Sequence, residues 1–238
     1  MTASIDGGAV IRRTFNMYLA HALVLLPAAA VVFGPIGIVN AIMIAAAPGF
    51  VYVSFLISAV AITLFTGMVV KLVDDVQDGR RDTSVGQLLL VVTPVLGELF
   101  LVGTVAGIGI FIGFILIVVP GLFLATVWSV AAPIIVLERP GGLLALRRSR
   151  ELVRGNGWQV FSVVFVMVFL VGLFASGVAL AANSVGTGLG LAIRVIMGML
   201  TAPLAALAAA VLYFELRAAS SMASTDDIDL STITSRVP

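Results

Sequence analysis

The sequence predicts an all-α protein, a polytopic transmembrane bundle of about six helices with a short amphipathic helix between the fourth and fifth. Composition is the first observation behind this fold class, because 61% of the 238 residues are hydrophobic and only 11% are charged. A soluble domain has about 45–50% and about 25% of these residues. The apolar residues also form uncharged runs of about 20 residues, the length that crosses a bilayer. The basic residues gather between alternate runs, as in membrane proteins of fixed orientation.

The first two spans lie before residue 74. Residues 1–13 are short and polar, and the first apolar run covers residues 16–39. The run is longer than the about 7–15 residues of a signal-peptide core, which indicates a retained helix. After a turn at residues 47–49, the second span covers residues 50–73.

The remaining spans follow a charged loop at residues 74–82, which is expected to face water, with its Asp side chains pairing with Arg80 and Arg81. The break between the third and fourth spans is predicted at residues 106–109, and a kink at Pro120, because proline removes one helical N–H. The last four spans are predicted over residues 85–106, 110–137, 158–182 and 189–214.

The predicted domain organisation has three parts. Residues 1–13 form an N-terminal cytoplasmic segment, and residues 14–217 form the six-helix membrane domain. Residues 218–238 are rich in Ser, Thr and Asp, which predicts a disordered cytoplasmic tail.

Orientation follows from the basic residues. If the N-terminus lies inside, twelve of the 13 Lys and Arg residues fall in inner segments and Arg194 falls outside. The positive-inside rule therefore predicts cytoplasmic N- and C-termini in the inner (cytoplasmic) membrane.

Composition also excludes several kinds of site. The net charge of +1 gives no indication of a nucleic-acid partner. With no cysteine and one histidine, His21, the chain has no thiolate nucleophile and no polyhistidine metal site. No phosphate-binding, zinc or triad-like motif is present. We therefore predict no catalytic residue, no metal ligand and no cofactor.

The strongest candidate inside the membrane is a polar pair formed by Glu98 and Arg194. Glu98 lies about 20 Å along the third span, which places it in the outer half of the membrane, and Arg194 enters the sixth span from outside. An intramembrane charge costs about 2.5–3.5 kcal/mol and commonly marks a functional site. The pair would line a substrate or proton path, or be a structural salt bridge. A salt bridge is the favoured interpretation. His21 is expected to bond a headgroup or a carbonyl rather than relay protons.

Residues 143–154 predict the amphipathic helix. Arg147, Arg150 and Arg154 fall on one helical face, and Ala145, Leu146, Ser149, Leu152 and Val153 fall on the other. Such a helix is suited to lying at the inner membrane surface, where each arginine would contact anionic lipid headgroups. The alternative is that these arginines only set the orientation of the protein in the membrane, as positive charges commonly do, without recognising a lipid.

Three segments in this order carry a family resemblance: residues 73–87, residues 120–139 and residues 146–158. Over residues 10–217 the chain resembles the YciC-like proteins and the membrane domain fused to some glycerophosphodiester phosphodiesterases. The resemblance implies a six-helix membrane protein of uncharacterised function and supplies no catalytic residues.

The functional prediction is a non-enzymatic membrane protein that acts as an assembly or interaction partner in membrane or envelope homeostasis. The alternative is a small transporter or lipid-handling protein that uses Glu98 and Arg194 as its polar element. Expected partners are membrane lipids, an unidentified membrane protein or a second copy of the chain.

Overall fold

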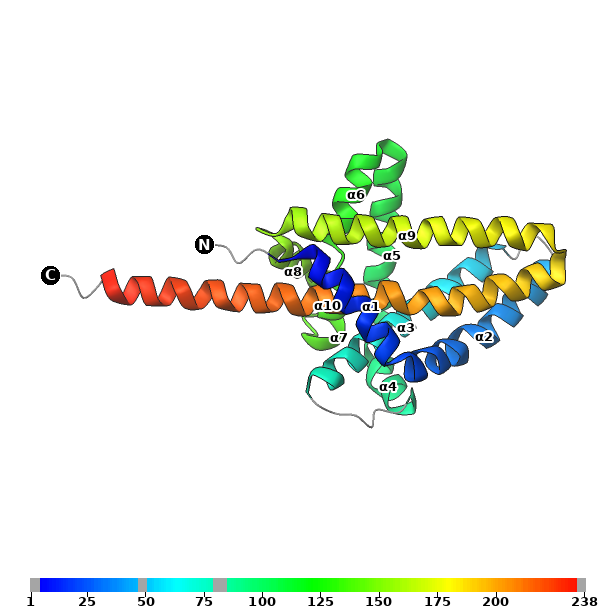
Figure 1. The fold of residues 1–238 in the computed structure, drawn as a ribbon, viewed down its shortest axis with the longest axis horizontal. Helices are drawn as coiled ribbons and strands as arrows, with labels where there is room; N and C mark the ends of the chain where they lie inside the picture. The colour runs from blue at the N-terminus through cyan, green and yellow to red at the C-terminus, as the bar shows by residue number, and fades with distance from the viewer. Residues whose placement is uncertain (1–4, 47–50, 79–84, 235–238) are drawn as a thin grey trace.

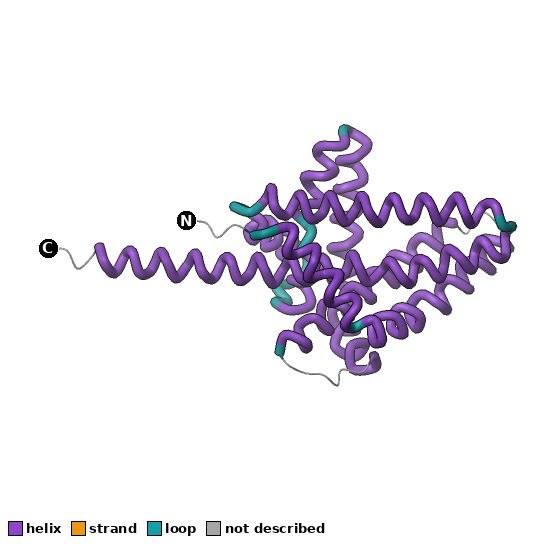
Figure 2. Tube along the Cα trace, in the orientation of Figure 1, coloured by secondary structure: helices purple, strands orange, loops and turns teal. Residues whose placement is uncertain are grey.

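The computed structural model describes residues 5–46, 51–78 and 85–234. This part of the chain is helical and contains no strand (Figure 2), which confirms the all-α prediction. The helices are, in order, α1 Gly7–Ala20, α2 Ala22–Ala46, α3 Val51–Gln77, α4 Val85–Val92, the 3₁₀ turn η2 Thr93–Val95, α5 Leu96–Leu116, α6 Val118–Val127, α7 Ala131–Leu137, α8 Leu144–Val153, α9 Gly157–Ser184 and α10 Thr187–Thr234.

Helical segments long and apolar enough to cross a bilayer make up most of the molecule. Five are found within the described residues, at Ala22–Asn40, Gly86–Leu116, Val119–Leu137, Gly157–Ala182 and Gly188–Ser221. Helix α3, with 27 residues, occupies the second predicted span. By length and composition, these segments agree with the predicted count of about six.

Helices α2, α3, α9 and α10 run lengthwise through the molecule (Figure 1), and α10 packs against the other three. The core between them is apolar, with Leu25, Phe65 and Leu207 almost fully buried. Helix α1 begins and α10 ends on the side where α8 lies, and the α9–α10 turn is at the opposite end. We refer to these as the α8 end and the turn end.

The first predicted span is divided into two helices. Helix α1 begins inside the segment predicted to precede the membrane, because Asp6 accepts a 2.9 Å hydrogen bond from the amide of Gly8 and caps the helix. It ends at Ala20 with His21 as its C-cap, and α2 begins at Ala22. Helix α1 lies along α10, where Arg13 Nη1 is 2.6 Å from Glu215 Oε1 and the Tyr18 hydroxyl donates to the carbonyl of Leu200 at 3.0 Å.

The turn between α5 and α6 lies at Ile117, and the prediction of a break at residues 106–109 is wrong. Ile117 has an extended backbone with φ −162° and ψ 146°. Gly109 and Gly113 are packing positions rather than helix breakers. Gly109 lies against the ring of Trp128, and Gly113 lies against the backbone of Gly121. Lacking side chains, these glycines let α5 and α6 approach closely.

The α5–α6 hairpin crosses the long helices instead of running beside them, and its tip projects beyond α9 (Figure 1). At the base of the hairpin, α7 is buried against α3, α5 and α8. Pro120 lies in the first turn of α6, where proline fits a helix, so no kink forms there. The helical break comes later, at residues 128–130.

The C-terminal segment continues α10 as far as Thr234, where composition predicted disorder from residue 218. No proline or glycine interrupts the chain between Pro203 and Thr234, so helix formation can propagate. The expected turn at residues 47–49 and the expected pairing of Arg80 and Arg81 lie outside the described residues.

Candidate functional site

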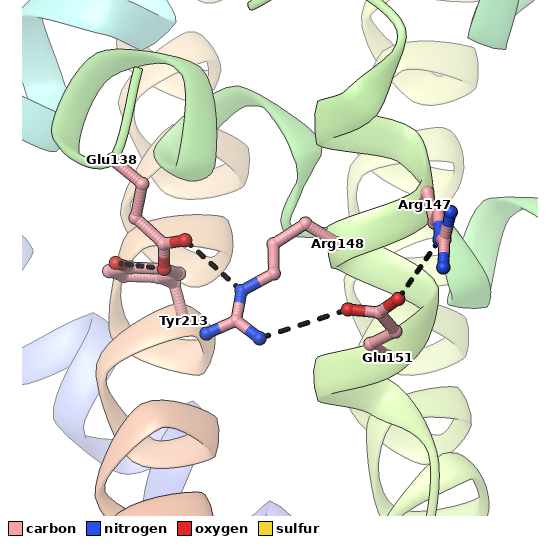
Figure 3. Close-up of polar contacts among 5 residues, drawn as sticks. All are labelled: Glu138, Arg147, Arg148, Glu151 and Tyr213. Atoms are coloured by element: carbon pink, nitrogen blue, oxygen red, sulfur yellow. Dashed lines mark hydrogen bonds and ion pairs between the residues drawn. The ribbon is translucent and has the colours of Figure 1, made fainter. Parts of the chain in front are cut away.

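Five polar residues of the α8 end form a connected cluster around Glu138 (Figure 3), and they are Glu138, Arg147, Arg148, Glu151 and Tyr213. Glu138 caps the C-terminus of α7, and the chain then reverses into α8. The reversal uses left-handed backbone at Arg139, with φ 49°, and at Gly141, with φ 86°. It brings Arg148 of α8 and Tyr213 of α10 to the same carboxylate.

Glu138 joins three helices. Its Oε1 accepts a 2.8 Å hydrogen bond from the Tyr213 hydroxyl, and its Oε2 accepts a 3.1 Å bond from Arg148 Nε. Tyr213 is 0% exposed. Both carboxylate oxygens therefore have partners, and α7, α8 and α10 are tied together by charge-assisted bonds.

The cluster extends along the outer face of α8. Arg148 Nη1 lies 3.8 Å from Glu151 Oε2, and Arg147 Nε donates to Glu151 Oε1 at 3.1 Å (Figure 3). The side chains of Arg147 and Glu151 are 78% and 50% exposed. Exposed pairs of this kind contribute about 0–1 kcal/mol, so the stabilising part of the cluster is the Glu138 centre.

Helix α8 has the two faces that its sequence predicts. Arg147, Arg150 and Arg154 are exposed and form what we call the arginine face. The opposite face is buried, and Ser149 Oγ donates to the carbonyl of Val127 at 2.7 Å. The apolar face therefore packs on the protein. The location of α8 at the inner membrane surface and the contact of its arginine face with lipid headgroups both stay predictions.

Glu98 lies at the α8 end. Its Oε2 accepts a 3.4 Å hydrogen bond from the amide of Gly142, in the loop between α7 and α8. The depth predicted from helix length assumed a helix running along the bundle, whereas α5 crosses the bundle. Glu98 is partly buried and has a donor, as expected for a packed structural residue.

Arg194 lies near the turn end, seven residues after the start of α10. Along the helix it is about 28 Å from Tyr213, at about 1.5 Å per residue. Tyr213 bonds Glu138, which is close to the Gly142 loop that contacts Glu98. The structure thus does not bring Glu98 and Arg194 together.

His21 caps α1 between the first two helices. Its Nδ1 lies 3.2 Å from the carbonyl oxygen of Met17, one helical turn earlier. A carbonyl partner is what the sequence predicted for a lone histidine near the interface. The contact fixes the side chain at the α1–α2 junction.

Three further ion pairs were not predicted from the sequence. Lys71 Nζ of α3 lies 2.8 Å from Asp74 Oδ2 and 2.9 Å from Asp75 Oδ1, and the i, i+3 and i, i+4 spacing could have revealed these contacts. The Arg13–Glu215 pair joins distant parts of the chain and has no local signal. Within the described residues, no three His, Asp or Glu side chains are grouped as a metal site.

Sequence comparison finds a relative among bacterial membrane proteins. The chain is 36% identical over 93 residues to a UPF0259 membrane protein of Pectobacterium carotovorum, a match that covers 39% of this chain and 37% of the relative. The chain is a multi-pass membrane protein. The helices of membrane-spanning length and the relative agree on this description. No family model and no solved structure matches the chain.

Proposed function

We propose that this protein is a non-enzymatic interaction partner within the cytoplasmic membrane, and that the arginine face of α8 is its contact surface. The proposal rests on a difference between two groups of residues at the α8 end, one bonded within the protein and one facing outward. Arg148 and Tyr213 both donate to Glu138, and these bonds hold α8 in place. Arg150 and Arg154 point outward, and neither forms an ion pair with another described residue.

A surface of this kind suits binding rather than catalysis. A rigid helix that presents fixed positive charges can recognise anionic groups, either lipid phosphates or acidic segments of a membrane protein. A second copy of the chain would be a partner of the same class. A role in membrane or envelope homeostasis fits such a protein.

The alternative, a small transporter or lipid-handling protein, needs a water path to an intramembrane charge. Glu98 instead contacts the Gly142 amide beside the α7–α8 loop, which supports the interaction proposal. If the protein is a transporter, Glu98→Gln should abolish transport. If it is an interaction protein, the same substitution should leave binding at the arginine face unchanged.

The proposed orientation places α8 and both chain termini in the cytoplasm. The positive-inside rule supports it, because α8 and its flanks carry five arginines, Arg139, Arg147, Arg148, Arg150 and Arg154. We also propose that the chain belongs to the YciC-like group, because it resembles that group most clearly in residues 73–158. The UPF0259 relative supports its coarser form, an uncharacterised membrane protein family.

The test is purification of the full chain in native-lipid discs, followed by mass spectrometry of co-purified proteins and lipids. Wild type is compared with Arg150→Glu, which reverses one charge of the arginine face. Arg12→Glu is the matched control, because Arg12 is also an exposed arginine and lies on α1.

The proposal expects a recurrent partner, protein or anionic lipid, that Arg150→Glu depletes several-fold and Arg12→Glu leaves in place. A stoichiometric ligand that is unaffected by Arg150→Glu but lost with Glu98→Gln would support the transporter instead. Equal depletion by both arginine variants would mean that only general charge matters, and would contradict a defined contact surface.

A further inference from the structure

We infer that the α5–α6 hairpin inserts into the lipid of one leaflet, the leaflet next to α8, and does not cross the bilayer. Both limbs are long and apolar enough to cross by length and composition. The fold, however, limits how far the tip can reach. The assignment of this leaflet as the cytoplasmic one rests on the proposed orientation.

The base of the returning limb is fixed at the level of α8. Val127, the last residue of α6, accepts the 2.7 Å hydrogen bond from Ser149 of α8. The other face of α8 carries exposed arginines, which require water or headgroups. Trp158, 77% exposed at the start of α9, follows α8 directly. An exposed tryptophan at a helix end is typical of the headgroup region.

The length of α6 then sets the depth of the tip. Helix α6 has 10 residues and is therefore about 15 Å long. Ile117, at the tip, can lie no further than this from the level of Val127. The hydrocarbon core is about 30 Å thick, so the tip cannot reach the opposite surface. The transverse course of the hairpin in Figure 1 makes the depth smaller still.

The surface of the hairpin identifies lipid as what covers it. No charged residue occurs between Glu98 and Glu138. Large apolar side chains are exposed all round the projecting part, at Ile108, Phe111, Ile112, Ile115, Leu116, Ile117, Val119 and Phe123. A patch of this extent is not stable in water. It also lacks the polar face that a helix needs to lie at the surface.

A second protein chain is a poorer fit than lipid. Helix pairs in membranes associate through small residues that allow close backbone contact. Gly113 and Gly121 already pack on each other between α5 and α6, and Gly109 packs on the Trp128 ring just after α6. The exposed Gly103 and Gly107 lie nearer the base of α5, whereas the side chains that face outward around the tip are large Ile, Leu, Val and Phe residues, the kind that contact acyl chains.

The absence of cysteine makes the inference directly testable. Ile117→Cys is introduced into the full chain in sealed vesicles of known orientation, and labelling with a membrane-impermeant maleimide is measured from each side. Ser184→Cys, next to the α9–α10 turn, and Ser220→Cys, on the C-terminal part of α10, calibrate the two aqueous sides, since both serines are exposed.

The expected result is no labelling of Ile117→Cys from either side and full labelling after detergent is added. A fluorophore attached at this position should be quenched most strongly by lipids that carry spin labels along the acyl chain. Labelling from the turn side at the rate of Ser184→Cys would overturn the inference, and so would strongest quenching by headgroup-labelled lipids.

A replacement variant and a comparison of the two serine positions separate failure of the hairpin inference from other failures. Leu116→Cys, also exposed at the tip, replaces Ile117→Cys if that variant does not fold. If Ser184→Cys and Ser220→Cys exchange sides while Ile117→Cys stays shielded, the proposed orientation fails and the single-leaflet hairpin stands.

Discussion

At the scale of single residues, one carboxylate organises the α8 end of the molecule. Glu138 bonds a buried tyrosine and an arginine that come from two other helices. A buried hydroxyl that donates to a charged acceptor contributes more than one that donates to a neutral carbonyl. The contacts of Tyr213 and Tyr18 provide this comparison within one protein.

We predict that Tyr213→Phe lowers the free energy of unfolding by about 1.5–3 kcal/mol, because a charged acceptor loses its donor. Tyr18→Phe, which removes a 3.0 Å bond to the neutral Leu200 carbonyl, should cost about 0.5–1.5 kcal/mol. Denaturant unfolding in mixed micelles measures both. Equal losses, or a larger loss for Tyr18→Phe, would contradict the central role of Glu138.

The two glutamates of the cluster should also differ. Glu138→Gln is expected to lower the unfolding free energy by about 1–3 kcal/mol, because two charge-assisted bonds are weakened. Glu151→Gln should cost less than about 1 kcal/mol, since its arginine partners are exposed. The same unfolding assay compares them, and the prediction fails if Glu151→Gln costs as much as Glu138→Gln.

At the scale of elements, the close contact of α5 with α6 depends on particular glycines. A methyl group at Gly113 would lie 2.8 Å from the Gly121 Cα, whereas one at Gly107 would meet no atom within 4 Å. Both glycines are in the same helix. Their substitution therefore separates helix–helix packing from helix propensity.

Gly113→Ala is expected to destabilise the protein by about 1–3 kcal/mol, because the two helices must move apart. Gly107→Ala should be neutral or stabilising by up to about 1 kcal/mol, since alanine favours the helix. Thermal unfolding in detergent, followed by tryptophan fluorescence, measures the signs. Destabilisation by Gly107→Ala as large as that by Gly113→Ala would contradict the packing described for the hairpin.

At the scale of the whole molecule, local properties of the sequence predicted more than long-range ones. Uncharged runs predicted the long helices, and the spacing of Arg147, Arg150 and Arg154 predicted the two faces of α8. The sequence could not indicate that α8 packs on Val127, because contacts between distant segments leave no periodic pattern. The α5–α6 turn was misplaced because a glycine can either break a helix or pack inside a helix pair. Glu98 was assigned to Arg194 instead of the Gly142 amide because the depth estimate assumed that its helix runs along the bundle, whereas α5 crosses it.

The most direct test of the account measures which side of the membrane each end of the bundle faces. Single cysteines replace Ser184, at the turn end, and Ser220, at the α8 end, and intact cells are treated with an impermeant maleimide. The account predicts that Ser184→Cys is labelled in intact cells and that Ser220→Cys is labelled only after the cytoplasmic side is opened. Labelling of both variants in intact cells, or of Ser220→Cys alone, would contradict it.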